Sequence, residues 1–244
     1  MLKLNDDKTV MLHIRSPYSR PMPPVVRGLQ IGTTAIFPST SARNIGVLFD
    51  DELKMTTHID SVCRSCFSQL RNLSKIRHLI PSAYMKMLVH AFITSRLDYA
   101  NALLIGLPDG HLQRLQRIQN VAARLVTGCD RSTSSTELLR SLHWLPVRAR
   151  IKFKINIMTY RCLNNMAPSY LKELIKPYVP SRSLRSGNKN LLVVPRSRSI
   201  RYGRRAFAFA APTEWNALPE TVRLSDSLFT FKSRLKTHLF PKDD

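Results

Sequence analysis

Glycine and cysteine are scarce in this 244-residue chain. The eight glycines form no glycine-rich loop of the kind that cradles nucleotide phosphates. Among the four cysteines, Cys63 and Cys66 have half the spacing of a zinc site, but a second Cys or His pair is missing, although His58 is a further candidate ligand. Both cysteines fall on the apolar stripe of a predicted helix. We therefore predict buried core cysteines, no metal and no cofactor.

Long apolar runs are missing as well. No stretch approaches the roughly 18 residues that a membrane-spanning helix needs, and the N-terminal residues lack the apolar core of a signal peptide. These absences predict an intracellular protein, nuclear or cytoplasmic, with reduced cysteines and no membrane partner.

Acidic residues are few. The chain has 16 Asp and Glu against 38 Lys and Arg, a formal net charge of +22. Between Glu173 and Glu214 there is no acid at all, but there are nine Lys and Arg. Such a surface attracts polyanions. We expect RNA or DNA as the partner, ahead of an anionic membrane surface, and no small-molecule substrate.

The hydrophobic pattern changes twice along the chain. Residues 1–55 hold three short runs rich in β-branched residues, 9–14, 25–32 and 42–49, which predict a small antiparallel sheet; Ile45, Val47 and Phe49 would alternate onto one face. Residues 56–175 show repeated 3.6-residue stripes that predict a helical bundle. Residues 176–244 are basic and partly irregular, with one expected strand at 191–195 and a final helix capped by Ser225 or Asp226. The predicted class is α+β, mainly α.

Asp6 and Asp7 form an adjacent acidic pair, as in the two-metal sites of polymerases. Such a site also needs a third carboxylate from another strand and a tight aromatic hairpin, and neither is found beside this pair. Asn and Asp favour turns, so we predict a turn leading into the strand at Thr9. Asp50 and Asp51 receive the same interpretation.

Basic side chains remain as the candidate functional residues. Arg114, Arg117 and Arg124 share the helix face opposite the leucines, and Arg148, Arg150, Lys152 and Lys154 follow on the next long helix. A charged helix face is usually only solvated. Because the sign here is almost uniform, phosphate contact is the favoured interpretation. The predicted nucleic-acid-binding residues are Lys8, Arg43, Arg114, Arg117, Arg124, Arg148, Lys152, Arg201, Arg204 and Arg205.

Several long segments resemble one family. They are "LKLNDDKT", "ARNIGVLFDDELKMTTHIDSVCRSCFSQLRNLSKIRHLI", "HAFITSRLDYANALLIGLP", "LQRLQRIQNVAARLVTG", "SLHWLPVRARIKFKI", "APSYL", "YVPSRSLRS" and "RAFAFAAPTEWNALP". Together they resemble the reverse transcriptase of LINE-type, non-LTR retrotransposons of the jockey and chicken-repeat kind, over essentially the whole chain.

The resemblance implies a location within that polyprotein. "NDDKT" is similar to the motif just after the catalytic hairpin of the palm, with Lys8 at the lysine of that motif. "RNIGVLF" is similar to the strand pair that grips the primer end, and the remainder to the thumb and beyond. The family's aromatic-x-Asp-Asp motif has no counterpart in these 244 residues.

Together these observations predict a truncated reverse transcriptase fragment that is not itself an enzyme and at most binds nucleic acid without sequence preference. Two alternatives stay open: a basic module that binds an acidic protein, and a translated retroelement remnant without function.

Overall fold

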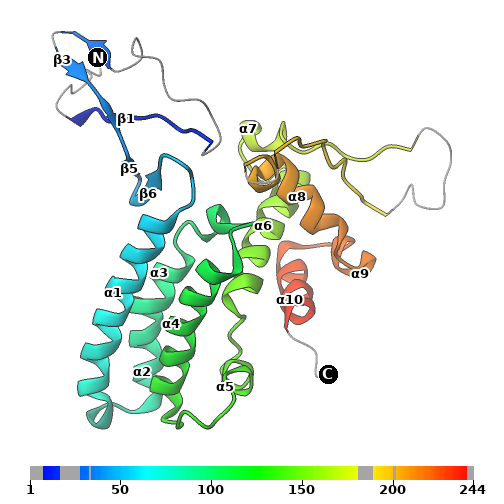
Figure 1. Ribbon diagram of the computed structural model, residues 1–244. Helices are drawn as coiled ribbons and strands as arrows, with labels where there is room; N and C mark the ends of the chain where they lie inside the picture. The colour runs from blue at the N-terminus through cyan, green and yellow to red at the C-terminus, as the bar shows by residue number, and fades with distance from the viewer. Residues whose placement is uncertain (1–7, 17–27, 33, 181–188, 200–201, 241–244) are drawn as a thin grey trace. The chain divides into compact units, whose positions relative to one another are not determined.

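A computed structural model describes residues 8–16, 28–32, 34–180, 189–199 and 202–240. The predicted class is confirmed: the fold is α+β and mainly α (Figure 1). Contacts divide the chain into two compact units, residues 1–64 and 65–244. The expected boundary at residue 55 lies near this division, whereas residues 175 and 176 both lie inside the second unit.

The first unit contains short strand pairs. They are β1 (Met11–Leu12) with β4 (Pro38–Ser39), β2 (Leu29–Ile31) with β3 (Thr34–Ile36), and β5 (Ser41–Asn44) with β6 (Val47–Asp50). The prediction of one antiparallel sheet is wrong for the described residues, because the three pairs are separate and β1 runs parallel to β4. Such short ladders bury little: Ile36 and Val47 are their only buried side chains among the described strand residues.

The run 42–49 is a hairpin rather than one strand. Asn44 pairs with Val47, which leaves Ile45 and Gly46 as a two-residue loop, and both have positive φ (44° and 77°). Positive φ at both central positions is the pattern of the tight turn that matches the twist of a hairpin. Ile45 is therefore 82% exposed at the tip and does not share a face with Val47 and Phe49.

The first helix begins at Thr56. Just before it, the carboxylate of Asp50 accepts hydrogen bonds from the backbone N–H groups of Lys54 and Thr56. This contact ends β6 and opens α1, so Asp50 has a local structural role. The helices with their bounds are α1 (Thr56–Lys75), α2 (Ser82–Val89), the π-helix η4 (His90–Thr94), α3 (Ser95–Asp98), the 3-10 helix η5 (Asn101–Leu104), α4 (Asp109–Thr127), α5 (Ser135–Ser141), α6 (Val147–Leu163), α7 (Ser169–Lys172), the 3-10 helices η3 (Arg77–Leu79) and η6 (Gly203–Arg205), α8 (Phe207–Asn216), α9 (Glu220–Arg223) and α10 (Leu228–Leu239).

Helix α6 is the centre of the second unit. It contacts α4 on one side and α8 and α10 on the other, as Figure 1 shows. Its sequence is buried around much of its circumference, including the polar residues Asn156 and Thr159. The sequence predicted an inward stripe of Val147, Ile151, Ile155 and Met158; the first three are buried and Met158 is half-buried. Because neighbouring helices cover more than one face of α6, a single stripe does not mark all of its buried residues.

The C-terminal residues share a core with α6. Trp215 and Phe231 are fully buried against Tyr160, whose ring stacks on that of Phe231 with centroids 4.5 Å apart. The segment that seemed irregular contains α8, although Pro212 lies inside it. Packing outweighs the helix-breaking tendency of proline here.

Two local expectations in this region need correction. The expected strand at 191–195 is reduced to an isolated bridge between Pro177 and Leu192. The final helix is capped by Ser227, whose hydroxyl accepts the N–H of Thr230 at 3.1 Å, and not by Ser225 or Asp226. Ser225 is buried and donates to the carbonyl of Val222.

Candidate nucleic-acid interface

The outer face of α4 carries the predicted arginines. The inner stripe of this helix, from Leu112 through Ile118 to Val126, is buried, and Arg117 on the opposite side is exposed. Arg114 is half-buried one turn earlier on the same face. These two side chains lie as the 3.6-residue period predicted.

Arg124, the third arginine of this face, forms hydrogen bonds within the fold. Its guanidinium donates to the carbonyl of Thr133 at 3.1 Å, which ties the loop after α4 to the helix. Its Nε is buried and has no hydrogen-bond partner among the described residues. A guanidinium held in this way has fewer donors left for a phosphate.

The cations of α6 are paired with acids from distant parts of the sequence. Arg148 pairs with Asp109, Arg150 pairs with Asp98 through two nitrogens, and Lys152 pairs with Glu214 at 3.0 Å. The sequence suggested a face of nearly uniform sign because these acids lie 39 to 62 positions away along the chain. Folding therefore neutralises much of this basic cluster locally. Lys154, one turn beyond Arg150, is exposed and forms no ion pair with a described acid.

Arg204 and Arg205 are neighbours in η6 with different environments. Arg205 donates to the backbone carbonyls of Ile105 and Leu103 at 3.2 and 3.3 Å. A Cβ at Gly106, which has a φ of +68°, would lie 2.9 Å from the Arg205 side chain, so the chain approaches this arginine closely. Arg204 is exposed. Arg205 thus supports the fold, whereas Arg204 is open to a ligand.

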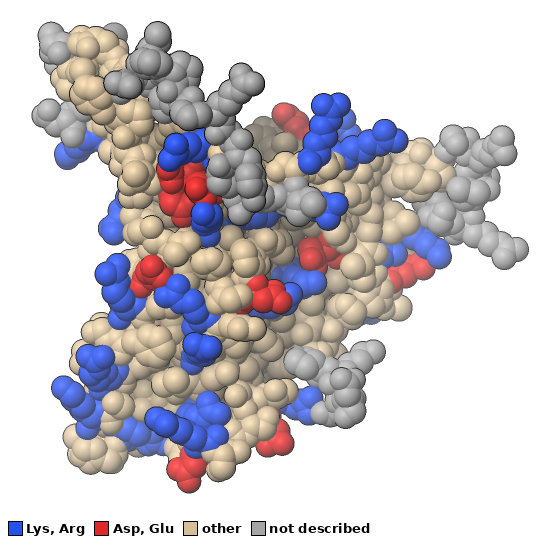
Figure 2. Space-filling view, in the orientation of Figure 1, with Lys and Arg blue, Asp and Glu red and all other residues tan. Residues whose placement is uncertain are grey.

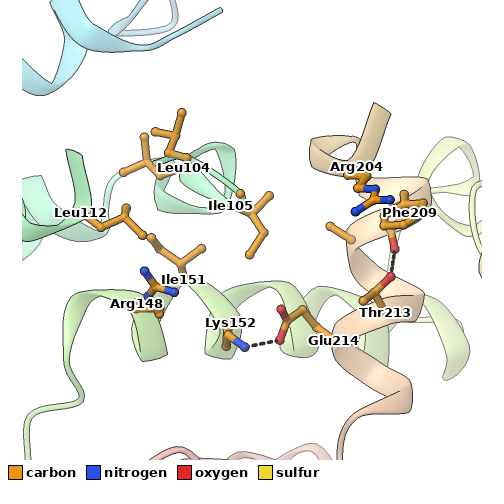
Figure 3. Close-up of a pocket in the computed structure, with 13 residues that line it drawn as sticks. Leu104, Ile105, Leu112, Arg148, Ile151, Lys152, Arg204, Phe209, Thr213 and Glu214 are labelled. Atoms are coloured by element: carbon orange, nitrogen blue, oxygen red, sulfur yellow. Dashed lines mark hydrogen bonds and ion pairs between the residues drawn. The ribbon is translucent and has the colours of Figure 1, made fainter. Parts of the chain in front are cut away.

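A hollow of about 230 Å³ is lined by residues of η5, α4, α6, η6 and α8; Figure 3 draws these residues. Leu104, Leu112 and Ile151 form an apolar floor, and Arg148 and Arg204 lie at its edge. The pair of Lys152 and Glu214 closes one side. This arrangement brings together Arg148, Lys152 and Arg204 from the predicted set, but two of these three cations already have acidic partners.

The remaining predicted residues lie elsewhere. Lys8 and Arg43 are exposed in the first unit. Asp6, Asp7 and Arg201 lie outside the described residues, so the predicted turn at the acidic pair is not among the features that the structure describes.

Two arginines with clear roles escaped the sequence reasoning. Arg77 donates to the carbonyls of Leu125 and Val126, at 2.6 and 3.3 Å, and so caps the C-terminal end of α4. Arg223 is buried and donates to the carbonyls of Lys189, Asn216 and Leu218. Burial lowers the pKa of Arg223, and Glu220 opposes that shift. No local pattern marks these residues, because their acceptors are backbone atoms of other segments.

Three of the four cysteines are core residues, and Cys129 is exposed. Cys63 and Cys66 are buried in α1, as the apolar stripe predicted, and Cys162 is buried in α6, where burial raises the pKa of its thiol and Lys172 partly opposes this. Burial also lowers the pKa of His58. Within the described ranges, no three His, Cys, Asp or Glu side chains gather as a metal site would require.

Figure 2 shows that Lys and Arg outnumber Asp and Glu on the face that it draws. The described part of residues 65–240 carries 26 Lys and Arg against eight Asp and Glu, and Asp98, Asp109 and Glu214 are already in ion pairs. The net charge of the described part of this unit is therefore strongly positive.

Comparisons with known proteins return no match among protein-family models, curated proteins or solved structures. No helix in the described ranges has both the length and the apolar character of a membrane span.

Proposed function

We propose that this chain binds RNA or DNA through phosphate contacts, without reading base sequence and without catalysing polymerisation. The observation that carries the proposal is the net positive charge of the described residues, with Arg117 exposed on the outer face of α4 and Arg204 exposed in η6. Cations on a rigid helix meet a line of phosphates without needing any base-reading geometry.

The segments that resemble the post-palm region of LINE-type reverse transcriptases support the same proposal. A chain derived from that region would hold a template–primer while another part performs the chemistry. The aromatic-x-Asp-Asp motif of that family is not in this sequence, and phosphoryl transfer needs such metal-binding carboxylates.

A salt titration tests the proposal. The full chain is titrated with an RNA strand, a DNA duplex and an acidic peptide. The salt concentration is varied from about 50 to about 300 mM, because phosphate contacts weaken over this range. Each phosphate contact contributes about −0.9 to the slope of log K against log salt on duplex, and about −0.7 on single strands.

The double substitution Arg114→Gln/Arg117→Gln should reduce the duplex slope by about 1.8 if each side chain holds one phosphate. Arg161→Gln/Lys232→Gln, which removes two exposed cations from α6 and α10, is the matched control. Tighter binding of the peptide than of either nucleic acid would favour an acidic protein as the partner. Absence of binding to all three ligands would favour a remnant without function.

A further inference from the structure

A second hollow, of about 440 Å³, lies between α6 and α10 and is also lined by His90 of η4, Asn101 of η5 and Trp144. We call it the α6–α10 hollow. Its volume falls within the roughly 300–1,000 Å³ range of sites that bind small molecules. It shares none of its lining residues with the hollow of Figure 3.

The charges around the α6–α10 hollow favour an anion. Arg150 is neutralised by Asp98, but Lys154 and Lys236 also line the hollow, and neither forms an ion pair with an acid in the described part of the chain. Lys236 lies over the ring of Phe240, with its nitrogen 5.9 Å from the ring centroid. Two ammonium groups without acidic partners therefore face one cavity.

Helix α6 supplies the apolar part of the lining. Phe153 and Ile157 lie one turn apart on this helix, are only partly buried, and line the hollow together with Leu145. An inorganic anion would gain nothing from such a wall, and an apolar molecule would gain nothing from the lysines. A nucleotide has both parts, a flat ring and a phosphate.

Two buried polar atoms beside the hollow lack partners. Nε1 of Trp144 and Oδ1 of Asn101 form no hydrogen bond with any described residue, although the two side chains are only 5% and 4% exposed. A buried polar atom left unpaired costs about 1–3 kcal/mol, so most such atoms in proteins are satisfied. One is a donor and the other an acceptor, and the edge of a nucleobase offers both.

The backbone around the hollow is irregular at the same points. His143 and Ala100, which directly precede Trp144 and Asn101, have positive φ (56° and 51°), and His90 begins the π-helix. The ring of His90 meets that of Trp144 edge to face at 5.3 Å. Strained backbone and π-helical turns concentrate at binding sites.

We propose that the α6–α10 hollow binds one unstacked nucleotide, with the base against Phe153 and Ile157 and the phosphate between Lys154 and Lys236. Because the Trp144 and Asn101 atoms are sealed from solvent, the hollow's side chains must shift slightly as the base enters. The inference deepens the proposed function: a strand held along its phosphates places one base in the hollow. A free mononucleotide has the same chemistry.

The experiment compares two RNA strands of equal length, one of uridines and one with the same backbone but no bases. Stacking of one base on an aromatic side chain makes binding roughly tenfold tighter, so the full chain should prefer the uridine strand by about that factor. Phe153→Leu, which keeps an apolar side chain, should reduce this preference to about twofold or less. Lys154→Gln/Lys236→Gln should weaken the binding of both strands by the same factor. The control Arg161→Gln/Lys232→Gln makes the same charge change on the same two helices but outside the hollow, and it should weaken binding less.

The two proposals fail separately. If neither strand binds, the proposed function fails. If both strands bind equally with a normal salt slope, or if Phe153→Leu keeps the full preference, only the hollow's role is overturned. Competition by uridine monophosphate at millimolar concentration identifies a free nucleotide as the ligand; competition only by the uridine strand identifies a base within a strand. Circular dichroism of each variant separates lost binding from lost folding.

Discussion

The outer face of α4 and the C-terminal segment from residue 189 to 240 are both rich in arginine, yet they use it differently. Arg117 on α4 is exposed, whereas Arg223 is 6% exposed and donates to carbonyls of three other residues. Arg205 also donates to carbonyls, from a half-buried position. A high count of arginines therefore does not by itself indicate a binding surface.

The reason lies in how each region satisfies its backbone. A long helix such as α4 pairs most of its own carbonyls internally, and Arg117 remains on its surface, although Arg124 near its end donates to the carbonyl of Thr133. The segment 189–194 pairs with another part of the backbone only around the bridge between Leu192 and Pro177, and α9 has a single turn. Several carbonyls of this region therefore need donors from side chains. Arginine has five donors in a fixed plane, and Asn216 gives similar help through two hydrogen bonds to the backbone of Leu192.

The largest expected effect is on stability. Arg223→Met removes hydrogen bonds from a charged donor to buried carbonyls and should lower the free energy of unfolding by about 3 kcal/mol. Urea unfolding followed by circular dichroism measures the change. Arg234→Met is the matched control, because Arg234 is exposed and donates to the carbonyl of Thr221; it should cost less than about 1 kcal/mol. Equal costs for the two variants would contradict the role of Arg223.

Arg204 and Arg205, which are adjacent in η6, test the same difference between an arginine that binds a ligand and one that supports the fold. Arg205→Met should cost about 1–2 kcal/mol of stability, since two carbonyls lose a donor. Arg204→Met should cost less than about 0.5 kcal/mol but should flatten the salt dependence of duplex binding by about 0.9. Unfolding and salt titration are measured on both proteins. If both arginines prove to affect binding alone, η6 is part of the interface and not a support for η5.

A smaller effect is expected where an acid neutralises a cation. Arg148 and Asp109 are both exposed, so their ion pair should contribute little to folding. Asp109→Asn should cost at most about 1 kcal/mol, including the lost favourable position in the first turn of α4. It should also free Arg148 and steepen the duplex salt slope by up to about 0.9. An unchanged slope would show that this end of α6 does not meet phosphate.

Sequence reasoning succeeded where local periodicity decides the structure. The stripes containing Cys63, Leu115 and Ile151 gave the buried faces of α1, α4 and α6. It failed where distant segments decide the outcome: α8 forms despite Pro212 because Trp215 packs on α6, and Ile45 occupies a turn because Asn44 pairs with Val47. The candidate site followed the same rule. Arg117 could be placed from the period of its own helix, but the partners of Arg148 and Arg205 come from other segments.

The smallest expected effect concerns His90, whose pKa is lowered by burial, as is that of Arg223. Burial lowers the pKa of His90 below its usual 6.5; Lys86 and Arg150 lower it further, and Asp98 opposes them. Between the folded pKa and 6.5 the unfolded chain binds more protons, so stability falls as the pH drops through 6.5. His90→Asn should reduce this loss of stability. The loss is measured as the difference in urea midpoints between pH 7.5 and pH 5.5, which lie about one pH unit on either side of 6.5. His58, whose pKa burial also lowers, should account for part of the remaining dependence. If the variant loses as much stability as the parent protein, His90 takes up its proton in the folded state without cost.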